Sequence, residues 1–384
     1  MIDEEAFLHS NFQSYYRNNV LVIPDRIQAR EIGFIPFEGT MVRHIGFPDT
    51  RYATKFVSEN VPKHLYYSTA YYRKPDERNM QGKEWLGAEL IFDLDADHLK
   101  NASSMTYEQI LAEVKVHTMR LVNDYLLGDL GFSEKSLQVF FSGGRGYHVH
   151  AHGDDVYGMT SEMRREVANY CRIEGFGIGE YLKLMERSGN NSTGFTVRFN
   201  AFLSSFIGRL VTGGEKESAI AEKALGKRRF QKLIRGLSSN VSTGKGFEKR
   251  SALLIQRPRR KGFVLSQEER DIMETLLASF KEMSACEIDE PVTTDIHRLI
   301  RFPGSLHGKT GLRVMPVEIK DLEKFDPLTS AIPDVFRPGS VEVVLEKDFT
   351  MRMNGEDFSL KAGKNSVPTY LALFMVAQRK CKLK

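Results

Sequence analysis

Three aspartates at alternate positions are the first residues of this sequence that could do chemistry. They stand in the stretch ELIFDLDADHLK, residues 89–100, as Asp93, Asp95 and Asp97. Alternate side chains of a β-strand share a face, so Asp93 and Asp95 are expected to point the same way. Two carboxylates at this spacing repel each other unless a cation lies between them, and such hard oxygen ligands suit Mg²⁺ or Mn²⁺. The alternative is a strand end that runs into a solvated acidic turn, which describes Asp97 well.

A glycine-rich turn, FFSGGRGYHVH, is a second candidate site. Its glycines would let backbone N–H groups converge on an anion beside Ser142, and Arg145 could clamp that anion with two hydrogen bonds. His148, His150 and His152 follow at alternate positions and could share one strand face, a pattern that also suits a transition metal. We expect one histidine to serve the site and the other two to lie at the surface. A plain hairpin remains the alternative for the glycine turn.

A third stretch, CEIDEPVTTDIHRLIRFPGSLHGKTG, mixes acidic and basic groups. Its segment TDIHRLIR, residues 294–301, is predicted to form a short helix with Arg298 and Arg301 on one face. Pro303 would end that helix. Carboxylates that hold metals beside cations that hold phosphates are what triphosphate chemistry needs. An arginine pair on a solvated helix face is the alternative.

The elements that must position these groups alternate between helices and short strands. Helices are predicted at residues 4–18, 106–127 and 367–381, and strands at 30–47, 50–57, 88–94, 312–319 and 340–346, with a hairpin at 137–153. Thr106 and Gln109 resemble a capping box. Between residues 160 and 285 the sequence pattern becomes mainly that of helices. We therefore predict an α+β fold with a mixed sheet, in which residues 1–159 and 286–384 form one domain, which carries the three candidate sites, around a mainly helical insertion at 160–285.

The composition of the chain excludes several classes of protein. The 384 residues carry 54 lysines and arginines against 50 acids, a net charge of +4. Three widely spaced cysteines, Cys171, Cys286 and Cys381, give neither a disulfide framework nor a CxxC zinc pattern. The N-terminal stretch is acidic and polar, unlike a signal peptide, and no apolar run approaches the roughly 18 residues of a membrane span. We expect a soluble, cytoplasmic protein with no membrane partner.

The basic charge gathers inside the insertion. Between Gly226 and Lys261 there are twelve lysines and arginines against one acid, Glu248. Such a run suits the phosphate backbone of a nucleic acid. The alternatives are a solvated helix face with a mobile loop, or a surface that meets a partner subunit.

Taken together, three stretches resemble one family, the small catalytic subunit of archaeal and eukaryotic-type DNA primase. They are FDLDADH, SGGRGYH and the long pattern D-x-x-V-T-x-D-x-x-R-L-I-R-x-P-x-S-L-H-G-K-T-G-L from Asp289 to Leu312. Their order and spacing also match. The resemblance covers most of residues 1–155 and 285–384, and the last motif is the most specific.

The resemblance implies roles by position. Asp93 and Asp95 resemble the paired metal-binding aspartates, and Asp289 resembles the third catalytic carboxylate. Asp295 is instead expected to be the N-terminal charge of its helix. The expected contacts of the triphosphate and the incoming nucleotide are Ser142, Arg145, His148, Arg301, His307 and Arg43.

The implied reaction is template-directed, two-metal synthesis of short primers from nucleoside triphosphates on single-stranded DNA during replication. Mg²⁺ or Mn²⁺ would be bridged by the three aspartates. A second nucleotide site is implied but not located. A primase large subunit is the expected partner, and in the family it carries its own iron–sulfur cluster, which three scattered cysteines could not hold here.

The sequence departs from the family in one respect. The family usually carries a zinc knuckle of cysteines and histidines shortly after the aspartate pair. Residues 98–135 contain no cysteine and only two histidines, His98 and His117, so no structural zinc is expected.

Two rival functions stay open. One is a gap-filling repair polymerase of the same superfamily, against which the long third motif argues. The other is a non-catalytic subunit that binds single-stranded DNA. Synthesis without a primer would separate the first rival from a primase, and the effect of replacing Asp93 would separate the second.

Overall fold

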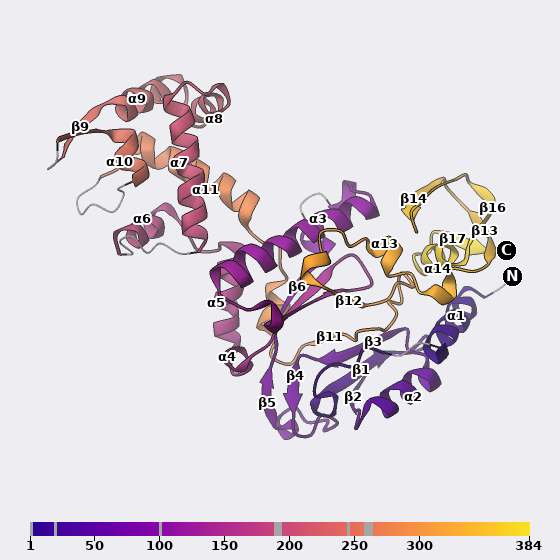
Figure 1. The fold of residues 1–384 in the computed structure, drawn as a ribbon. Coiled ribbons are helices and arrows are strands. Elements are labelled where there is room, and N and C mark those ends of the chain that lie inside the picture. The colour runs from indigo at the N-terminus through magenta and orange to yellow at the C-terminus, as the bar shows by residue number, and fades with distance from the viewer. Residues whose placement is uncertain (1–2, 19–20, 100–101, 188–193, 244–245, 257–263) are drawn as a thin grey trace. The chain divides into compact units, whose positions relative to one another are not determined.

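The computed structural model describes residues 3–18, 21–99, 102–187, 194–243, 246–256 and 264–384 (Figure 1). They form two compact units. Unit 1 comprises Met1–Val122, Phe132–Ala168 and Glu287–Lys384, and unit 2 comprises Asn123–Gly131 and Asn169–Cys286. The predicted domain boundaries, and the catalytic role of the first domain, remain predictions. The α+β class is confirmed.

Two four-stranded sheets form the centre of unit 1. The first has the order β11 (Leu299–Arg301), β3 (His64–Ser68), β1 (Glu31–Ile35), β2 (Val42–Gly46), and the second β12 (Met315–Val317), β7 (Leu137–Phe141), β8 (Tyr147–Ala151), β6 (Leu90–Leu94). Tyr67 of β3 stacks on His150 of β8 with ring centroids 6.3 Å apart, so the sheets face each other. All pairs within them are antiparallel, so the expected mixed sheet is wrong for the described strands.

The remaining strands of unit 1 form smaller sheets. They are β16 (Gly363–Pro368), β13 (Ser340–Leu345) and β17 (Cys381–Leu383), the hairpin β14 (Phe349–Met353) with β15 (Glu356–Leu360), and the pair β4 (Ala70–Tyr72) with β5 (Trp85–Ala88).

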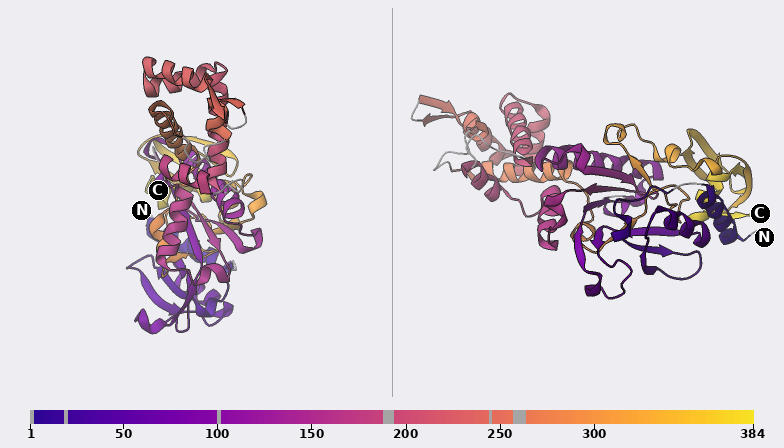
Figure 2. Two further views of the ribbon diagram at one scale, coloured as in Figure 1. Left: turned by 90° about the vertical axis from the view of Figure 1, so that its left-hand side faces the viewer. Right: turned by 60° about the horizontal axis from the view of Figure 1, so that its bottom comes forward.

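Helices surround these sheets. They are α1 (Glu4–Asn18), α2 (Thr50–Asn60), α3 (Tyr107–Arg120), α4 (Asp154–Tyr157), α5 (Ser161–Arg172), α12 (Glu290–Thr294), α13 (Pro327–Ser330) and α14 (Thr369–Ala377). Short 3₁₀ turns are η1 (Ile27–Ala29), η2 (Gln81–Lys83), η3 (Ala96–His98), η4 (Ala102–Ser104), η6 (Glu134–Ser136), η7 (Ile319–Asp321) and η8 (Asp334–Phe336), and α3 continues into a π-helix, η5 (Leu121–Asp129). The N-terminal α1 and the C-terminal α14 lie side by side (Figures 1 and 2).

Several predicted elements are confirmed. The helix at 4–18 is α1, and the capping box of Thr106 and Gln109 begins α3 with both reciprocal hydrogen bonds present. The predicted hairpin at 137–153 is formed by β7 and β8, which pair in register around the glycine turn.

Two of the predicted elements are wrong. Residues 50–57 form part of α2 and not a strand, because the Asp49 side chain caps the helix by accepting a hydrogen bond from the N–H of Tyr52 at 2.8 Å. Residues 294–301 are not a helix either. Asp295 is the C-terminal cap of α12, not the first charge of a helix, and Leu299–Arg301 pairs with β3 as the edge strand β11.

Unit 2 is mainly helical. Its elements are α6 (Ile178–Arg187), α7 (Phe195–Val211), α8 (Glu215–Leu225), α9 (Lys227–Ser238), the hairpin β9 (Asn240–Thr243) with β10 (Gly246–Lys249), α10 (Arg250–Gln256) and α11 (Gln267–Ser284). Its core is apolar, and Phe199 of α7 packs on Phe280 of α11 with ring centroids 5.3 Å apart.

The basic run at 226–261 is partly neutralised inside unit 2. Lys232 pairs with Glu268 at 3.0 Å, Arg250 pairs with Glu269 at 2.5 Å, and Arg229 pairs with Asp271. The acids belong to α11, outside the run, so counting charges within the run overstated its free charge. Residues 244–245 and 257–261 of the run lie outside the described residues.

Within the part of the chain that the structure describes, no helix is long and apolar enough to cross a membrane.

Candidate functional site

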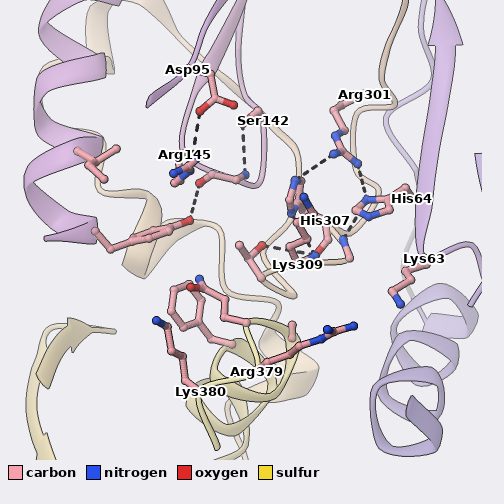
Figure 3. Close-up of a pocket in the computed structure, with 18 of the residues that line it drawn as sticks. Lys63, His64, Asp95, Ser142, Arg145, Arg301, His307, Lys309, Arg379 and Lys380 are labelled. Atoms are coloured by element: carbon pink, nitrogen blue, oxygen red, sulfur yellow. Dashed lines mark hydrogen bonds and ion pairs between the residues drawn. The ribbon is translucent and has the colours of Figure 1, made fainter. Parts of the chain in front are cut away.

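A cavity of about 1420 Å³ in unit 1 collects most of the predicted site residues. It is lined from β6 and the residue that follows it, the glycine turn, β11, the loop after β11, and the ends of α1 and α14. The predicted residues that line it are Asp93, Asp95, Ser142, Arg145, His148, Arg301 and His307. Figure 3 shows Asp95, Ser142 and Arg145 grouped on one wall, with Arg301, His307 and His64 beside them.

The aspartates come from β6 and the residue that follows it. Phe92 and Leu94 are fully buried while Asp93 is only partly buried, as strand alternation predicts. Asp289 precedes α12, and its backbone N–H donates to the carbonyl oxygen of Asp93 at 2.9 Å. The third carboxylate is therefore brought from nearly two hundred residues away to the strand that carries the first two, although it is not among the residues that line the cavity.

The electrostatics around Asp93 fit a cation. Burial raises the pKa of Asp93 to about 7, and the negative charges of Asp95 and Asp289 raise it too, while Arg298 and Arg301 lower it. A divalent ion between these carboxylates would relieve their repulsion, and carboxylate oxygens are the donors that Mg²⁺ and Mn²⁺ prefer. The residues present therefore fit a hard divalent cation.

Asp97 lies beyond the strand end, in η3, and is exposed. This agrees with the expectation that it is a strand-end charge. It also has a partner that the sequence did not reveal, because the Arg145 guanidinium donates to its carboxylate at 2.6 Å and lies 4.0 Å from that of Asp95. Asp97 thus orients Arg145 beside the aspartate pair.

The glycine turn packs tightly against two other segments. A Cβ at Gly146 would lie 2.2 Å from the carbonyl oxygen of Leu94, and one at Gly143 would lie 2.8 Å from the His307 side chain. Inside the turn the Ser142 hydroxyl accepts hydrogen bonds from the backbone N–H groups of Gly144 and Gly146, at 3.2 and 3.3 Å. Only glycine lets the turn reach both the aspartate strand and the loop after β11.

Arg301 is held between two histidines. One of its N–H groups donates to Nδ1 of His64, and another donates to Nε2 of His307 at 3.0 Å (Figure 3). Burial lowers the pKa of His64 to about 3 and that of His307 well below its usual value, and the positive charge of Arg301 lowers both as well. Both rings are therefore neutral acceptors, and the fixed positive charge between them is the guanidinium.

The three alternating histidines do not all lie where the sequence predicted. His148 lies opposite Asp93 in the β6–β8 register, with Nε2 3.6 Å from its carboxylate. His150 is not at the surface. It is buried and hydrogen-bonded through Nδ1 to Glu89 at 2.9 Å, and His152 is largely buried beside it. The predicted placement of two of these histidines at the surface is therefore wrong.

Glu89, His150 and His152 form a cluster whose ligand atoms lie within 4.8 Å of one another, so its geometry could hold a metal ion. Among the described residues it is the one group of three that meets this limit, and the three aspartates are spread more widely. However, Arg30 already donates to the Glu89 carboxylate from a buried position. Arg30 and His150 lower the pKa of Glu89 against the opposing effect of burial. The cluster therefore works as a charge-compensated network inside the core.

Arg43 is not brought to the cavity. It lies on β2, and its guanidinium donates to Glu31 at 2.9 Å within the first sheet. Arg43 is not among the residues that line the cavity, so the structure does not support its predicted contact with the nucleotide.

Several cationic or hydrogen-bonding residues of the cavity were absent from the predicted set, among them His64, Arg298 and Lys309. His64 could not be found from the sequence, since it belongs to no motif and reaches Arg301 only through the pairing of β3 with β11. Lys309 and Arg298 lie in the third motif, and both line the cavity. Their position in that motif was the available signal.

Comparisons with known proteins show what the chain is similar to. The family model described as DNA primase small subunit matches residues 92–319. The chain is similar to the DNA primase small subunit PriS of Picrophilus torridus, with 45% identity over 368 residues that cover 96% of this chain and 95% of the relative. It is 37% identical over 370 residues to that of Thermoplasma volcanium, with coverages of 95% and 94%. For Methanocella arvoryzae the identity is 35% over 391 residues, with 97% of both chains covered.

Proposed function

The chain belongs to the DNA primase small subunit family, and from that premise we propose that it is a nucleotidyltransferase that synthesises primers on single-stranded DNA. The observation that carries the proposal is the meeting of two sets of groups in one cavity. The partly buried carboxylates of Asp93 on β6 and of Asp95 just after it adjoin Arg145, Arg301 and a glycine turn, which are groups that bind phosphate. Unit 1 would be the catalytic domain and unit 2 its insertion.

In this proposal Asp93, Asp95 and Asp289 hold two divalent ions, Mg²⁺ or Mn²⁺. Such ions lower the pKa of an attacking hydroxyl and stabilise the charge on a leaving pyrophosphate. The chain's own groups bind and orient the triphosphate. Arg301 is held rigid by His64 and His307, and Arg145 is held by Asp97, so both guanidinium groups are preorganised before the nucleotide arrives.

Ser142 and His148 complete the predicted contacts. The Ser142 hydroxyl already accepts two backbone hydrogen bonds, so its own proton is available to a phosphate oxygen. His148 has a buried Nδ1 without a partner among the described residues, and burial, together with the charges of His150 and Arg301, lowers its pKa well below the usual value. A neutral His148 can donate one hydrogen bond without adding charge beside Asp93.

The proposed partners follow from the family name. A small subunit implies a large primase subunit, and primer synthesis implies a single-stranded DNA template and nucleoside triphosphates. A gap-filling polymerase remains the rival enzyme, and a non-catalytic DNA-binding subunit remains the rival from another class.

The test is a synthesis assay with the full chain, alone and with its large subunit. It uses a single-stranded template, labelled ribo- or deoxynucleotides, and Mg²⁺ or Mn²⁺, with and without an annealed primer. The proposal expects dinucleotides and longer primers in the absence of any added strand, and no product after chelation of the metal. Products that form only from an annealed primer would favour the repair polymerase, and no product with either substrate would favour the binding subunit.

A further inference from the structure

The C-terminal end of α14 delivers two cations to the cavity. Every residue of α14 from Tyr370 to Val376 is buried, so the helix is fixed in the core of unit 1. The chain then turns, and Arg379 and Lys380 line the cavity with exposed side chains. Neither side chain makes an ion pair or hydrogen bond with any residue that the structure describes. Lys63, by contrast, also lines the cavity but is paired with Glu5 at 3.4 Å.

The turn after α14 needs a left-handed backbone at one position, and an arginine occupies it. The N–H of Arg379 donates to the carbonyl of Val376 at 2.9 Å, and that of Lys380 donates to Met375 at 2.8 Å, which is the Schellman pattern that ends a helix. Arg379 occupies the left-handed position of this pattern, with φ +57°. Glycine is preferred there because it has no Cβ. Glycine would fit this turn without strain, so the turn itself does not require an arginine.

The two cations lie apart from the groups proposed to hold the incoming nucleotide. Figure 3 shows Arg379 and Lys380 on the wall across from Asp95, Ser142 and Arg145. The incoming triphosphate already has two arginines and the metal ions to balance its charge. The cavity of about 1420 Å³ also exceeds the roughly 300–1000 Å³ typical of a site for one small molecule. There is room and charge for a second phosphate-bearing ligand.

We propose that Arg379 and Lys380 bind phosphate groups of the second ligand in the cavity, the strand that is copied or the nucleotide that starts the primer, and not those of the incoming nucleotide. The inference rests on the proposed function for the identity of that ligand. Two ligands could supply these phosphate groups: the template, through its phosphodiesters, and the initiating nucleotide, through its 5′-triphosphate. A template-directed reaction that starts without a primer needs both.

A structural alternative is that the two cations only stabilise the carboxyl end of α14 through its dipole. The Arg379→Gly variant separates the two roles, because glycine relieves the strained turn while it removes the charge. We expect a melting temperature equal to or above that of the wild type, together with weaker binding. A purely structural role predicts the opposite, an unchanged function and a lower melting temperature.

The binding arm uses a fluorescein-labelled oligothymidine and the full chain, without metal or nucleotide. Arg379→Gly, Lys380→Ala and the double variant that carries both substitutions are compared with Lys382→Ala. Lys382 pairs with Glu346 and does not line the cavity, so this control removes a positive charge nearby but outside the cavity. If the template is the source, the double variant binds roughly fivefold more weakly and the slope of log affinity against log salt falls by about 0.7 per lost contact. Lys382→Ala should match the wild type.

The initiation arm compares de novo synthesis with extension of a dinucleotide that lacks a 5′-phosphate. If the initiating triphosphate is the source, the double variant loses roughly fivefold in de novo synthesis and nothing in extension. The KM for the incoming nucleotide on an annealed primer should stay within about twofold of the wild-type value in either case.

Two results overturn the inference. One is a double variant that equals the wild type in both arms. The other is a rise in the KM for the incoming nucleotide with both arms unchanged, which would assign the cations to the incoming triphosphate. These failures are distinct from failure of the proposed function, since a wild-type chain that makes no product would still be tested by the binding arm.

Discussion

The cavity contains two kinds of basic side chain. Arginines and lysines carry a fixed positive charge, and histidines are neutral hydrogen-bonding groups. Burial first, and then nearby positive charge, lowers the pKa values of His64 and His307. Both rings are therefore uncharged under ordinary conditions and act as acceptors for Arg301. The positive charge available to a phosphate resides in arginine and lysine, which keep it over the whole working range of pH.

His64 is expected to be a positioning residue for Arg301. Its Nδ1 accepts hydrogen bonds from the Arg301 guanidinium and, at 3.2 Å, from the N–H of Gly308. We predict that His64→Leu raises the KM for nucleotide roughly tenfold, since a hydrogen bond to a charged group is lost, while kcat changes little.

The matched variant is His64→Asn, whose side-chain oxygen can take the place of Nδ1. It should restore a KM near the wild-type value. Equal KM values for His64→Leu and the wild type would show that Arg301 needs no support from His64.

At the scale of elements, hydrogen bonds join the glycine turn to the loop after β11. The N–H of Ser142 donates to the carbonyl of Gly146 at 3.0 Å, and the Thr310 hydroxyl donates to the carbonyl of Gly143 at 2.5 Å. The turn is thereby tied to the loop after β11. The side chains proposed to contact a triphosphate, which come from the glycine turn with β8 and from β11 with the loop after it, are held close together by these bonds.

We predict that Gly146→Ala abolishes synthesis and lowers the free energy of unfolding by about 2 kcal/mol, because the new Cβ would lie 2.2 Å from the carbonyl oxygen of Leu94. Chemical denaturation and the synthesis assay measure the two effects. Gly158→Ala is the control, since a Cβ there meets no atom within 4 Å. A stable and active Gly146→Ala protein would contradict the close packing of the turn on β6.

The Glu89 network gives a prediction with a defined dependence on pH. Burial would raise the pKa of Glu89, but Arg30 and His150 lower it below its usual value. A carboxylate with a lowered pKa stabilises the fold above its ordinary pKa of about 4.3, and this contribution is lost as the pH falls toward the lowered value. Glu89→Gln should therefore cost about 3 kcal/mol near neutral pH, because it leaves Arg30 without a counter-charge.

The measurement is the difference in unfolding free energy between the wild type and Glu89→Gln as a function of pH. The difference should be largest near neutrality and should shrink as the solution is made more acidic than the ordinary pKa of a glutamate. Glu342→Gln, at an exposed pair with Lys384, should show almost no difference at any pH. A constant difference for Glu89→Gln would show that the network is not electrostatic.

The sequence predicted the elements with long or periodic patterns and missed those decided by neighbours. Strand alternation placed Asp93 correctly because Phe92 and Leu94 are fully buried. By contrast, residues 299–301 are a strand only because β3 offers them an edge, which no local pattern records. Short apolar runs carry too few residues to separate a period of 2 from one of 3.6.

In the candidate site, too, residues within a sequence motif were predicted, and residues placed by neighbouring elements were missed. Residues inside the three motifs were found from the sequence, and most of them line one cavity. His64, Arg379 and Lys380 were not, because their place depends on strand pairing and on the burial of α14. The predicted surface histidines failed because the partner sheet covers His150, and a single strand cannot reveal which of its faces is covered.

At the scale of the whole molecule, unit 2 carries cations that differ in their role. Arg229 is paired with Asp271, whereas Lys227, Arg228 and Arg235 of α9 are exposed. We predict that replacing these three by alanine weakens the affinity for single-stranded DNA and lowers its salt dependence, since each lost phosphate contact reduces the slope by about 0.7. Fluorescence anisotropy at several salt concentrations measures both.

The matched control is Arg229→Ala, which removes a paired cation from the same helix. It should leave the affinity for DNA near the wild-type value and lower the melting temperature slightly. If the triple variant binds DNA as the wild type does, the exposed face of α9 is a solvated surface or a contact for another protein.

The central claim is that Asp93 and Asp95 help to hold the catalytic metal ions of a primer-synthesising enzyme. The most direct measurement is the rate of primer synthesis by the Asp93→Asn, Asp95→Asn double variant, with circular dichroism as the control for folding. The account predicts a protein that is as stable as the wild type or more so, because carboxylate repulsion is removed, and a loss of about 4 kcal/mol of transition-state stabilisation, roughly a thousandfold in rate. A folded double variant that makes primers at the wild-type rate would contradict it.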